Sequence, residues 1–404
     1  MGEWGLLATP PETPGWEFGP EEYRRRVAAL RAGMARAGVD ALFLTSEKNI
    51  RYVSGFHSQT WVSPTRSRFV ILPREGAPVV VAPTTNLPGF RSTSWIEDLR
   101  GWPAPRPADD GVSLLVDALG TLVKPGGRIG TELGPESRLE MPAADFAGLT
   151  AGLDGRRFVD AGPVLRPVRM VKSEPELARA RRVGEIASQA FARLAPSLAL
   201  GQSEREIYAL HHRLLVELGA DKVPYLVPVS GPDGYEQINM GPTDRRVGPG
   251  DVLIIDVGAT WRGYFCDFDR NFAFGQPADE VRAAYGEVFA ATEAGLAAVR
   301  PGRTAADVWQ AMAAVLDPGG RAPTPVGRMG HGLGLDLTEP PSIAAGDETV
   351  LEAGMVITLE PSLVLPARPG RPRRLMVHEE NVVVTARGAE LLTRRAPATL
   401  PVVA

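Results

Sequence analysis

Residues 251–272 of the chain are Asp251-Val-Leu-Ile-Ile-Asp256-Val-Gly-Ala-Thr-Trp-Arg-Gly-Tyr-Phe-Cys-Asp267-Phe-Asp269-Arg-Asn-Phe272. The four aliphatic residues that follow Asp251 suit a β-strand that is buried on both faces. This strand is expected to end at Asp256, and Gly258 and Gly263 are expected to bracket a turn. A second strand then returns with Asp267. The segment therefore predicts a β-hairpin that carries several acidic residues.

The acidic residues of this hairpin predict a metal site. Residues two apart on a strand share a face, so Asp267 and Asp269 should point the same way. A buried carboxylate is costly unless it is paired, hydrogen-bonded or bound to a cation. A hairpin that directs several carboxylates to one place has little structural purpose, whereas a divalent cation would be held well by it.

Composition and charge exclude several classes of protein. The 404 residues carry a net charge of −4 and the pI is near 5.9, so no basic excess is available for nucleic acid. The single cysteine, Cys266, excludes internal disulfides and cysteine-rich zinc sites. No apolar run approaches the ~20 residues of a membrane span, and no signal pattern opens the chain. A soluble, cytoplasmic protein without a membrane or nucleic-acid partner is expected.

The chain is predicted to contain two domains after an N-terminal arm. Residues 1–20 are rich in proline, glycine and tryptophan, which predicts an irregular arm. Alternating helix and strand patterns over 21–165 predict a smaller α/β domain. A second domain is expected over 172–404, and Ser173 is the predicted N-cap of its first helix.

Three further motifs contain residues that bind metals. His331 is flanked by glycines, which leave an imidazole accessible. An apolar strand, 356–359, leads into Glu360, and Glu379 lies inside a predicted strand over 375–384. Each motif alone has an ordinary structural explanation. Together with Asp256 and Asp267 they form an oxygen-rich set that suits two divalent ions, with Mn, Co, Fe and Zn as candidates.

In this order, the motifs resemble those of the pita-bread metallohydrolases. The chain is most similar to the aminopeptidase P and prolidase branch, which has a creatinase-type N-terminal domain. The resemblance covers residue 21 to the end and is strongest over 172–404. It implies an α/β (α+β) fold in which a pita-bread catalytic domain follows the smaller domain. It also implies an Xaa-Pro peptidase that acts on short peptides as a homodimer.

The resemblance assigns a role to each of the five metal-binding residues. Asp256 would hold one ion, Asp267 and Glu379 would bridge both ions, and His331 and Glu360 would hold the other. Glu360 would also act as the acid/base partner of a hydroxide that bridges the metals. His331 and Glu360 are thus the expected catalytic residues.

Several positions depart from the pattern of this branch. Asn239 and Thr338 each stand where a histidine is usual, and Val377 stands where an arginine is usual. These positions normally grip the substrate. Asp269 replaces a common threonine, which makes it a candidate extra ligand or a partner of one. His57 and His378 are candidate substitute donors, although such histidines are more often structural.

Three functions therefore remain in competition. The first is an Xaa-Pro peptidase, which is the commonest activity of the nearest branch. The second is a metal-dependent hydrolase or lyase of a small non-peptide substrate, as in ectoine hydrolase and creatinase, and the replaced positions favour it. The third is a non-catalytic binding module on the same fold, which would have no need of four converging carboxylates.

Overall fold

The computed structural model describes residues 17–403 except for residues 64, 319–326 and 366–372. Most of the expected arm, residues 1–16, thus lies outside the described residues. The chain divides into two compact units, Met1–Val168 and Arg169–Ala404, which are considered separately. No helix among the described residues is both long and apolar enough to cross a membrane.

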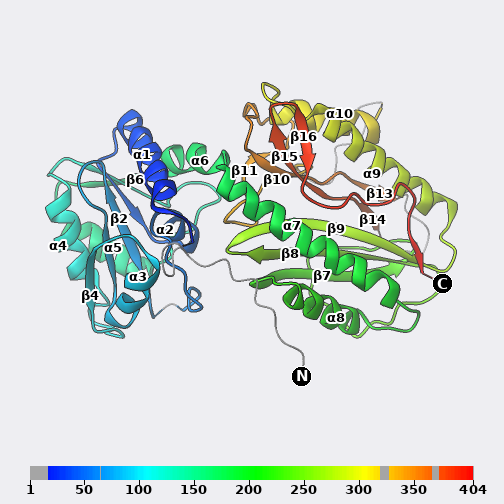
Figure 1. Ribbon diagram of the computed structural model, residues 1–404, viewed down its shortest axis with the longest axis horizontal. Coiled ribbons are helices and arrows are strands. Elements are labelled where there is room, and N and C mark those ends of the chain that lie inside the picture. The colour runs from blue at the N-terminus through cyan, green and yellow to red at the C-terminus, as the bar shows by residue number, and fades with distance from the viewer. Residues whose placement is uncertain (1–16, 64, 319–326, 366–372, 404) are drawn as a thin grey trace. The chain divides into compact units, whose positions relative to one another are not determined.

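Unit 1 is built on a six-stranded mixed sheet with the strand order β4-β3-β2-β1-β5-β6 (Figure 1). Strand β1 pairs antiparallel with β2 and parallel with β5. Its strands are β1 (Ala41–Leu44), β2 (Phe69–Pro73), β3 (Val79–Pro83), β4 (Asp98–Trp102), β5 (Arg128–Thr131) and β6 (Arg157–Asp160). Its helices are α1 (Pro20–Ala37), α2 (Glu47–Ser54), α3 (Leu87–Thr93), α4 (Val112–Leu122), α5 (Ala143–Gly152) and α6 (Gly162–Met170), the last of which runs into unit 2.

Unit 2 contains three sheets, whose orders are β17-β9-β8-β7, β11-β10-β12-β15-β16 and β13-β14. The strands of the first are β7 (Lys222–Pro232), β8 (Asp251–Trp261), β9 (Tyr264–Phe274) and β17 (Val402–Val403). The other strands are β10 (His331–Gly332), β11 (Glu339–Ser342), β12 (Val356–Leu359), β13 (Ser362–Leu365), β14 (Arg374–Val377), β15 (Glu380–Thr385) and β16 (Gly388–Leu391). The helices are α7 (Glu174–Leu194), α8 (Glu204–Glu217), α9 (Asp279–Ala298) and α10 (Ala305–Leu316). The mixed helix-and-strand architecture of both units confirms the predicted fold class.

Local sequence explains where the first helices of unit 2 begin. The Ser173 side chain accepts a hydrogen bond from the Glu176 backbone N–H, and the Glu176 carboxylate accepts one from the Ser173 backbone N–H. This capping box confirms Ser173 as the N-cap of α7. Helix α8 begins with an equivalent pair, Ser203 and Glu206.

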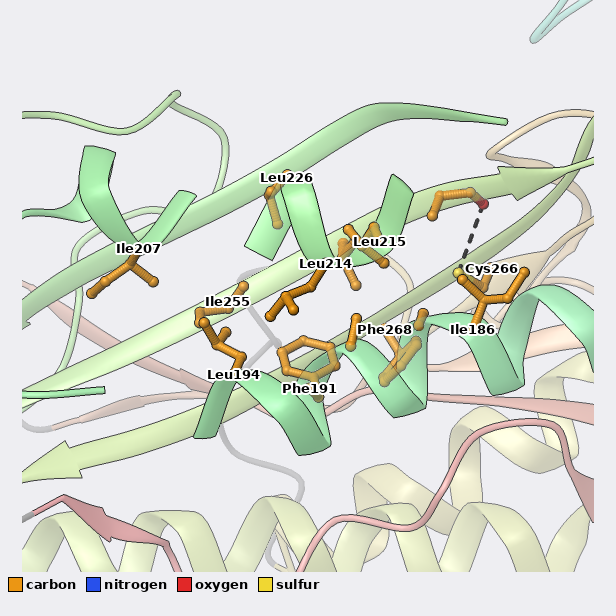
Figure 2. Packing of buried hydrophobic residues seen from close by; sticks show 14 of the residues in the cluster. Ile186, Phe191, Leu194, Ile207, Leu214, Leu215, Leu226, Ile255, Cys266 and Phe268 are labelled. Carbon is orange, nitrogen blue, oxygen red and sulfur yellow. Dashed lines mark hydrogen bonds between the residues drawn. The ribbon is translucent and has the colours of Figure 1, made fainter. Parts of the chain in front are cut away.

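Helices α7 and α8 cover one face of the β7-β8-β9 sheet. Figure 2 shows Phe191 of α7 and Leu214 of α8 packed against Ile255 of β8 and Phe268 of β9, all in one buried cluster. Alternate residues of β8, Val252 and Ile254, belong instead to a cluster with α9, β13 and β14. The expectation of a strand buried on both faces is therefore confirmed.

Candidate metal centre

The β8-β9 hairpin brings three acidic side chains to one face of its sheet. Asp256 is directly opposite Asp269 in the antiparallel register, and Gly258 is opposite Asp267. Residues opposite one another in such a pair share a face, as do residues two apart on one strand. Asp256, Asp267 and Asp269 therefore lie on one face, and each is at most 7 % exposed.

Two details of the hairpin differ from expectation. Asp256 lies in the middle of β8 rather than at its end, and Gly258 lies inside the strand rather than in a turn. The turn is at Arg262 and Gly263, both of which have positive φ. Gly258 is small for another reason: a Cβ there would lie 2.8 Å from Leu337 Cδ1 and 3.2 Å from Tyr225 Cβ.

His331 is held with one ring nitrogen directed at the acidic residues. Its Nδ1 lies 2.9 Å from the Gly332 carbonyl oxygen, so Nδ1 carries the proton and Nε2 keeps its lone pair. Nε2 lies 3.4 Å from Asp267 Oδ2. The preceding Gly330 has φ 135°, and a Cβ there would lie 2.1 Å from the Thr358 carbonyl oxygen, so glycine is required.

Glu360 and Glu379 come from two segments next to His331. Glu360 follows β12, and its backbone N–H donates to the Met329 carbonyl. Glu379 lies between β14 and β15, which corrects the expected continuous strand over 375–384. The next residue, Glu380, is engaged elsewhere, because Arg270 and Arg395 both donate to its carboxylate.

Three of the five predicted ligands meet closely. One ligand atom each of Asp267, His331 and Glu379 lies within 4.8 Å of the other two, and all three residues are buried. Asp256 and Glu360 are not part of this tight group. They are nevertheless close enough for their charges to raise the pKa of Glu379.

When no cation is bound, burial and neighbouring charges raise the pKa values of the clustered carboxyl groups. Burial, and then the charge of Asp267, raises the pKa of Asp256 to about 8. Burial likewise raises the pKa of Asp267 to about 8. The pKa of Glu360 is raised to about 7 by burial and by Asp267 and Asp256, although His331 opposes this. The pKa of Glu379 is raised well above its usual range by burial and by the neighbouring acids.

Unpartnered buried oxygens show that the site suits cations. Asp256 Oδ1, Asp269 Oδ2 and Glu379 Oε1 are all buried without a hydrogen-bond partner among the described residues. Buried carboxylate oxygens are normally satisfied, and each that is not raises the free energy of the folded state. Divalent cations would supply contacts to these oxygens and would offset the repulsion between the carboxylates. The residues present therefore fit a metal centre.

Two residues near the cluster were not identified from sequence. The Tyr225 hydroxyl lies 2.6 Å from Asp256 Oδ2, so it holds that carboxylate in place. The positive charge of Arg328 lowers the pKa of both Asp267 and Glu360, which places a guanidinium near the centre. Tyr225 has no motif of its own. Arg328 could have been noticed three positions before His331.

The remaining predicted residues lie in different settings. Both ring nitrogens of His378 are engaged, by Thr292 Oγ1 at 3.0 Å and Arg395 Nη1 at 2.9 Å, which is a structural role. His57 belongs to unit 1, where its Nδ1 lies 3.8 Å from Glu17 Oε1. Asn239 is exposed, Thr338 is half-buried, and Val377 is buried in β14.

Comparison with known proteins gives consistent relatives. The model of metallopeptidase family M24 matches residues 178–386, and that of the Creatinase/Prolidase N-terminal domain matches residues 26–171. The probable dipeptidase PepE of Mycobacterium tuberculosis is 32% identical over 383 residues, which cover 92% of this chain and 94% of the relative. An Xaa-Pro dipeptidase of Lactobacillus delbrueckii subsp. lactis is 26% identical, and the match covers 84% of this chain and 90% of the relative. A solved prolidase from Thermococcus sibiricus is 26% identical, has a TM-score of 0.84, and the match covers 95% of this chain and 100% of that chain.

Proposed function

This chain belongs to metallopeptidase family M24, and from that premise we propose that it is a dinuclear metallopeptidase that hydrolyses Xaa-Pro dipeptides. The observation that carries the proposal is the buried group of Asp267, His331 and Glu379, surrounded by carboxylate oxygens without partners. The names of the relatives, a dipeptidase, an Xaa-Pro dipeptidase and a prolidase, support a small peptide as substrate.

We assign five residues to the two ions. Asp256 would hold one ion, Asp267 and Glu379 would bridge both, and His331 and Glu360 would hold the other. The availability of His331 Nε2 supports its assignment, because Nδ1 is occupied by the Gly332 carbonyl. The unpartnered oxygens of Asp256 and Glu379 support theirs.

The ions would supply Lewis acidity, which polarises a peptide carbonyl and makes water more acidic near neutral pH. The chain's own residues would transfer protons during that reaction and keep the metal ligands oriented. Glu360 would accept a proton from water and return it to the leaving amine. Tyr225 would keep the Asp256 carboxylate in one orientation.

The replaced positions support a second candidate function. Asn239, Thr338 and Val377 stand where the resembled peptidases have two histidines and an arginine that grip the substrate. A hydrolase or lyase of a small non-peptide amide, amidine or ring would need a different set of gripping residues. The metal centre would be the same in both cases, so only the substrate distinguishes them.

Metal analysis and a substrate panel test the proposal together. Purified protein should carry about two divalent ions per chain by elemental analysis. Loaded with Mn²⁺, it should cleave Xaa-Pro dipeptides faster than matched dipeptides without proline. Asp267→Ala and Glu379→Ala should lose at least one ion, whereas Glu390→Ala, at an exposed ion pair with Arg181, should keep both.

The outcome of this panel decides between the candidates. A protein that binds two ions and leaves all Xaa-Pro dipeptides and Xaa-Pro-Xaa tripeptides intact would favour the second function. Native protein that remains metal-free and inactive with Mn²⁺, Co²⁺ and Zn²⁺ would contradict both. Manganese as the resident metal, a homodimer and a cytoplasmic location remain predictions, and size-exclusion chromatography with light scattering would test the dimer.

A further inference from the structure

Asp269 is the least exposed of the three acids on the hairpin face. Only 1% of its surface is exposed, and its Oδ2 atom has no hydrogen-bond partner among the described residues. It lies directly opposite Asp256 in the register of β8 and β9, so the two carboxylates leave the sheet on the same side. An unpartnered, buried carboxylate oxygen beside a metal ligand requires an explanation.

A hydrogen-bond network behind Asp269 fixes its other oxygen. Asn271 Nδ2 lies 3.2 Å from Asp269 Oδ1 and 2.7 Å from the Val377 carbonyl oxygen. The Tyr235 hydroxyl donates to Asn271 Oδ1 at 3.1 Å, and it accepts from the Val377 backbone N–H at 2.7 Å. These contacts orient the Asn271 amide, so one oxygen of Asp269 is held while the other stays without a partner.

We propose that Asp269 is an additional ligand of the ion on the Asp256 side of the centre. This inference rests on the proposed dinuclear centre and adds a sixth protein ligand to it. Five carboxylates then accompany a single imidazole: Asp256, Asp267, Asp269, Glu360 and Glu379. Such an oxygen-rich, anionic set favours a hard cation with a high coordination number, such as Mn²⁺, over four-coordinate Zn²⁺.

The alternative role for Asp269 is purely structural. In that case its carboxyl group would only hold Asn271 and, through it, the backbone of Val377. Loss of this hydrogen bond would lower the stability of the protein whether or not metal is present. A ligand behaves differently, because its charge destabilises the cation-free protein and stabilises the loaded one. Asp269→Asn keeps an oxygen that can accept from Asn271, so a purely structural role predicts little change in the cation-free state, whereas a ligand role predicts a gain in stability.

Asp269→Asn separates these roles, since it keeps the shape and removes the charge. Mn²⁺ is titrated calorimetrically into chelator-treated full-length protein, and thermal midpoints are measured with and without Mn²⁺. We expect the affinity for one of the two ions to fall about 10- to 100-fold. We also expect the midpoint of the cation-free variant to rise and its increase on adding Mn²⁺ to shrink. The preference for Mn²⁺ over Zn²⁺ should fall as well.

Asp251→Asn is the matched control. Asp251, on β8, is likewise a buried aspartate of this hairpin, but it is paired with Arg245 at 2.8 Å. This variant should lower the thermal midpoint and leave both Mn²⁺ affinities at the wild-type values. If Asp269→Asn does not fold, the Mn²⁺ affinities of Asp269→Thr provide the test, because threonine also lacks the charge.

Each outcome has a distinct meaning. Wild-type Mn²⁺ affinities in a folded Asp269 variant would overturn the ligand role and leave the dinuclear centre intact. An unchanged or lower midpoint in the cation-free variant, with unchanged affinities, would overturn it in favour of the structural role. Failure of the wild-type protein to bind two ions would instead contradict the proposed function itself.

Discussion

His211 is a fully buried imidazole on α8, and it packs against the Phe191 ring at a centroid distance of 4.5 Å. Neither ring nitrogen has a hydrogen-bond partner among the described residues. A buried polar group without a partner costs about 1–3 kcal/mol. We therefore expect His211→Leu, which has a similar volume, to raise the free energy of unfolding of unit 2 by about 1–2 kcal/mol at pH 7. Urea or thermal unfolding measures this.

The same residue gives a dependence on pH. Burial lowers the pKa of His211 to about 3, so the folded protein keeps the ring neutral while the unfolded chain binds a proton below about pH 6.5. Stability is thus lost as the pH falls from about 6.5 towards 3. The advantage of the variant should be larger at pH 5 than at pH 7, by about 2 kcal/mol. An advantage that does not change with pH would show that the ring is not held neutral.

Sequence predicted single residues well where side-chain alternation alone decides direction. The two-residue spacing of Asp267 and Asp269 placed both on one face, and the observed register agrees. Tyr225 could not be found in this way, because its role depends on the pairing of β7 with β8. The sequence around a tyrosine in a strand does not indicate which carboxylate its hydroxyl will contact.

At the scale of elements, Glu380 connects β15 to β9 and to the C-terminal segment. Its fully buried carboxylate accepts from Arg270 at 3.0 Å, from Arg395 at 3.1 Å and from the Ala396 backbone N–H at 2.9 Å. Arg270 also donates to the Glu379 carbonyl oxygen at 3.2 Å. The network therefore positions the segment that carries one of the proposed metal ligands.

Glu380→Ala should destabilise unit 2 strongly, because it removes the carboxylate that pairs with the largely buried Arg270 and one of the two carboxylates that pair with Arg395. We expect a loss of about 3–5 kcal/mol in unfolding measurements. The affinity for metal should also fall, since the Glu379 backbone loses support. Glu390 lies on the neighbouring strand β16, where it is a half-exposed partner of Arg181. Glu390→Ala should lower the free energy of unfolding by less than about 1 kcal/mol. Equal losses in the two variants would contradict this account.

Two elements show why sequence alone could not define the whole site. The apolar run over 375–384 predicts one strand, yet it forms β14 and β15, which belong to different sheets. The break lies at His378 and Glu379, and periodicity cannot reveal a change of partner strand. Gly258 likewise resembles a turn residue, but it is required where Leu337 and Tyr225 approach the sheet. Both errors arose because tertiary contacts determine these positions.

At the scale of the whole molecule, the fold class and a metal centre could be predicted because several metal-binding motifs occur together in one chain. These motifs are far apart in the sequence. Acids near 256–267 and 360–379 and a histidine at 331 are separated by more than 50 residues in places. Only a fold that brings strands from different sheets together can join them. The M24 match, which spans residues 178–386, covers the same range.

The cation-free protein should therefore respond to pH in a way that the loaded protein does not. The pKa of Asp256 and of Asp267 is raised to about 8, and that of Glu360 to about 7, so the folded state binds protons that the unfolded state releases near pH 4. Their stabilising effect is complete below about pH 4 and is lost as the pH rises through 7 and 8. Chelator-treated protein should lose roughly 4–5 kcal/mol of stability between pH 6.5 and 8.5.

Divalent cations should reverse this dependence, because they bind the deprotonated carboxylates and displace the protons. Stability with saturating Mn²⁺ should stay constant or rise over the same pH interval, and calorimetry in buffers of different ionisation enthalpy should detect proton release. The interval lies above the range in which His211 contributes, so the two effects can be separated. If chelator-treated protein were as stable at pH 8.5 as at pH 6.5, the carboxyl groups could not be packed together as the structure has them. The metal centre would then have to form by a rearrangement of the hairpin rather than on a prepared site.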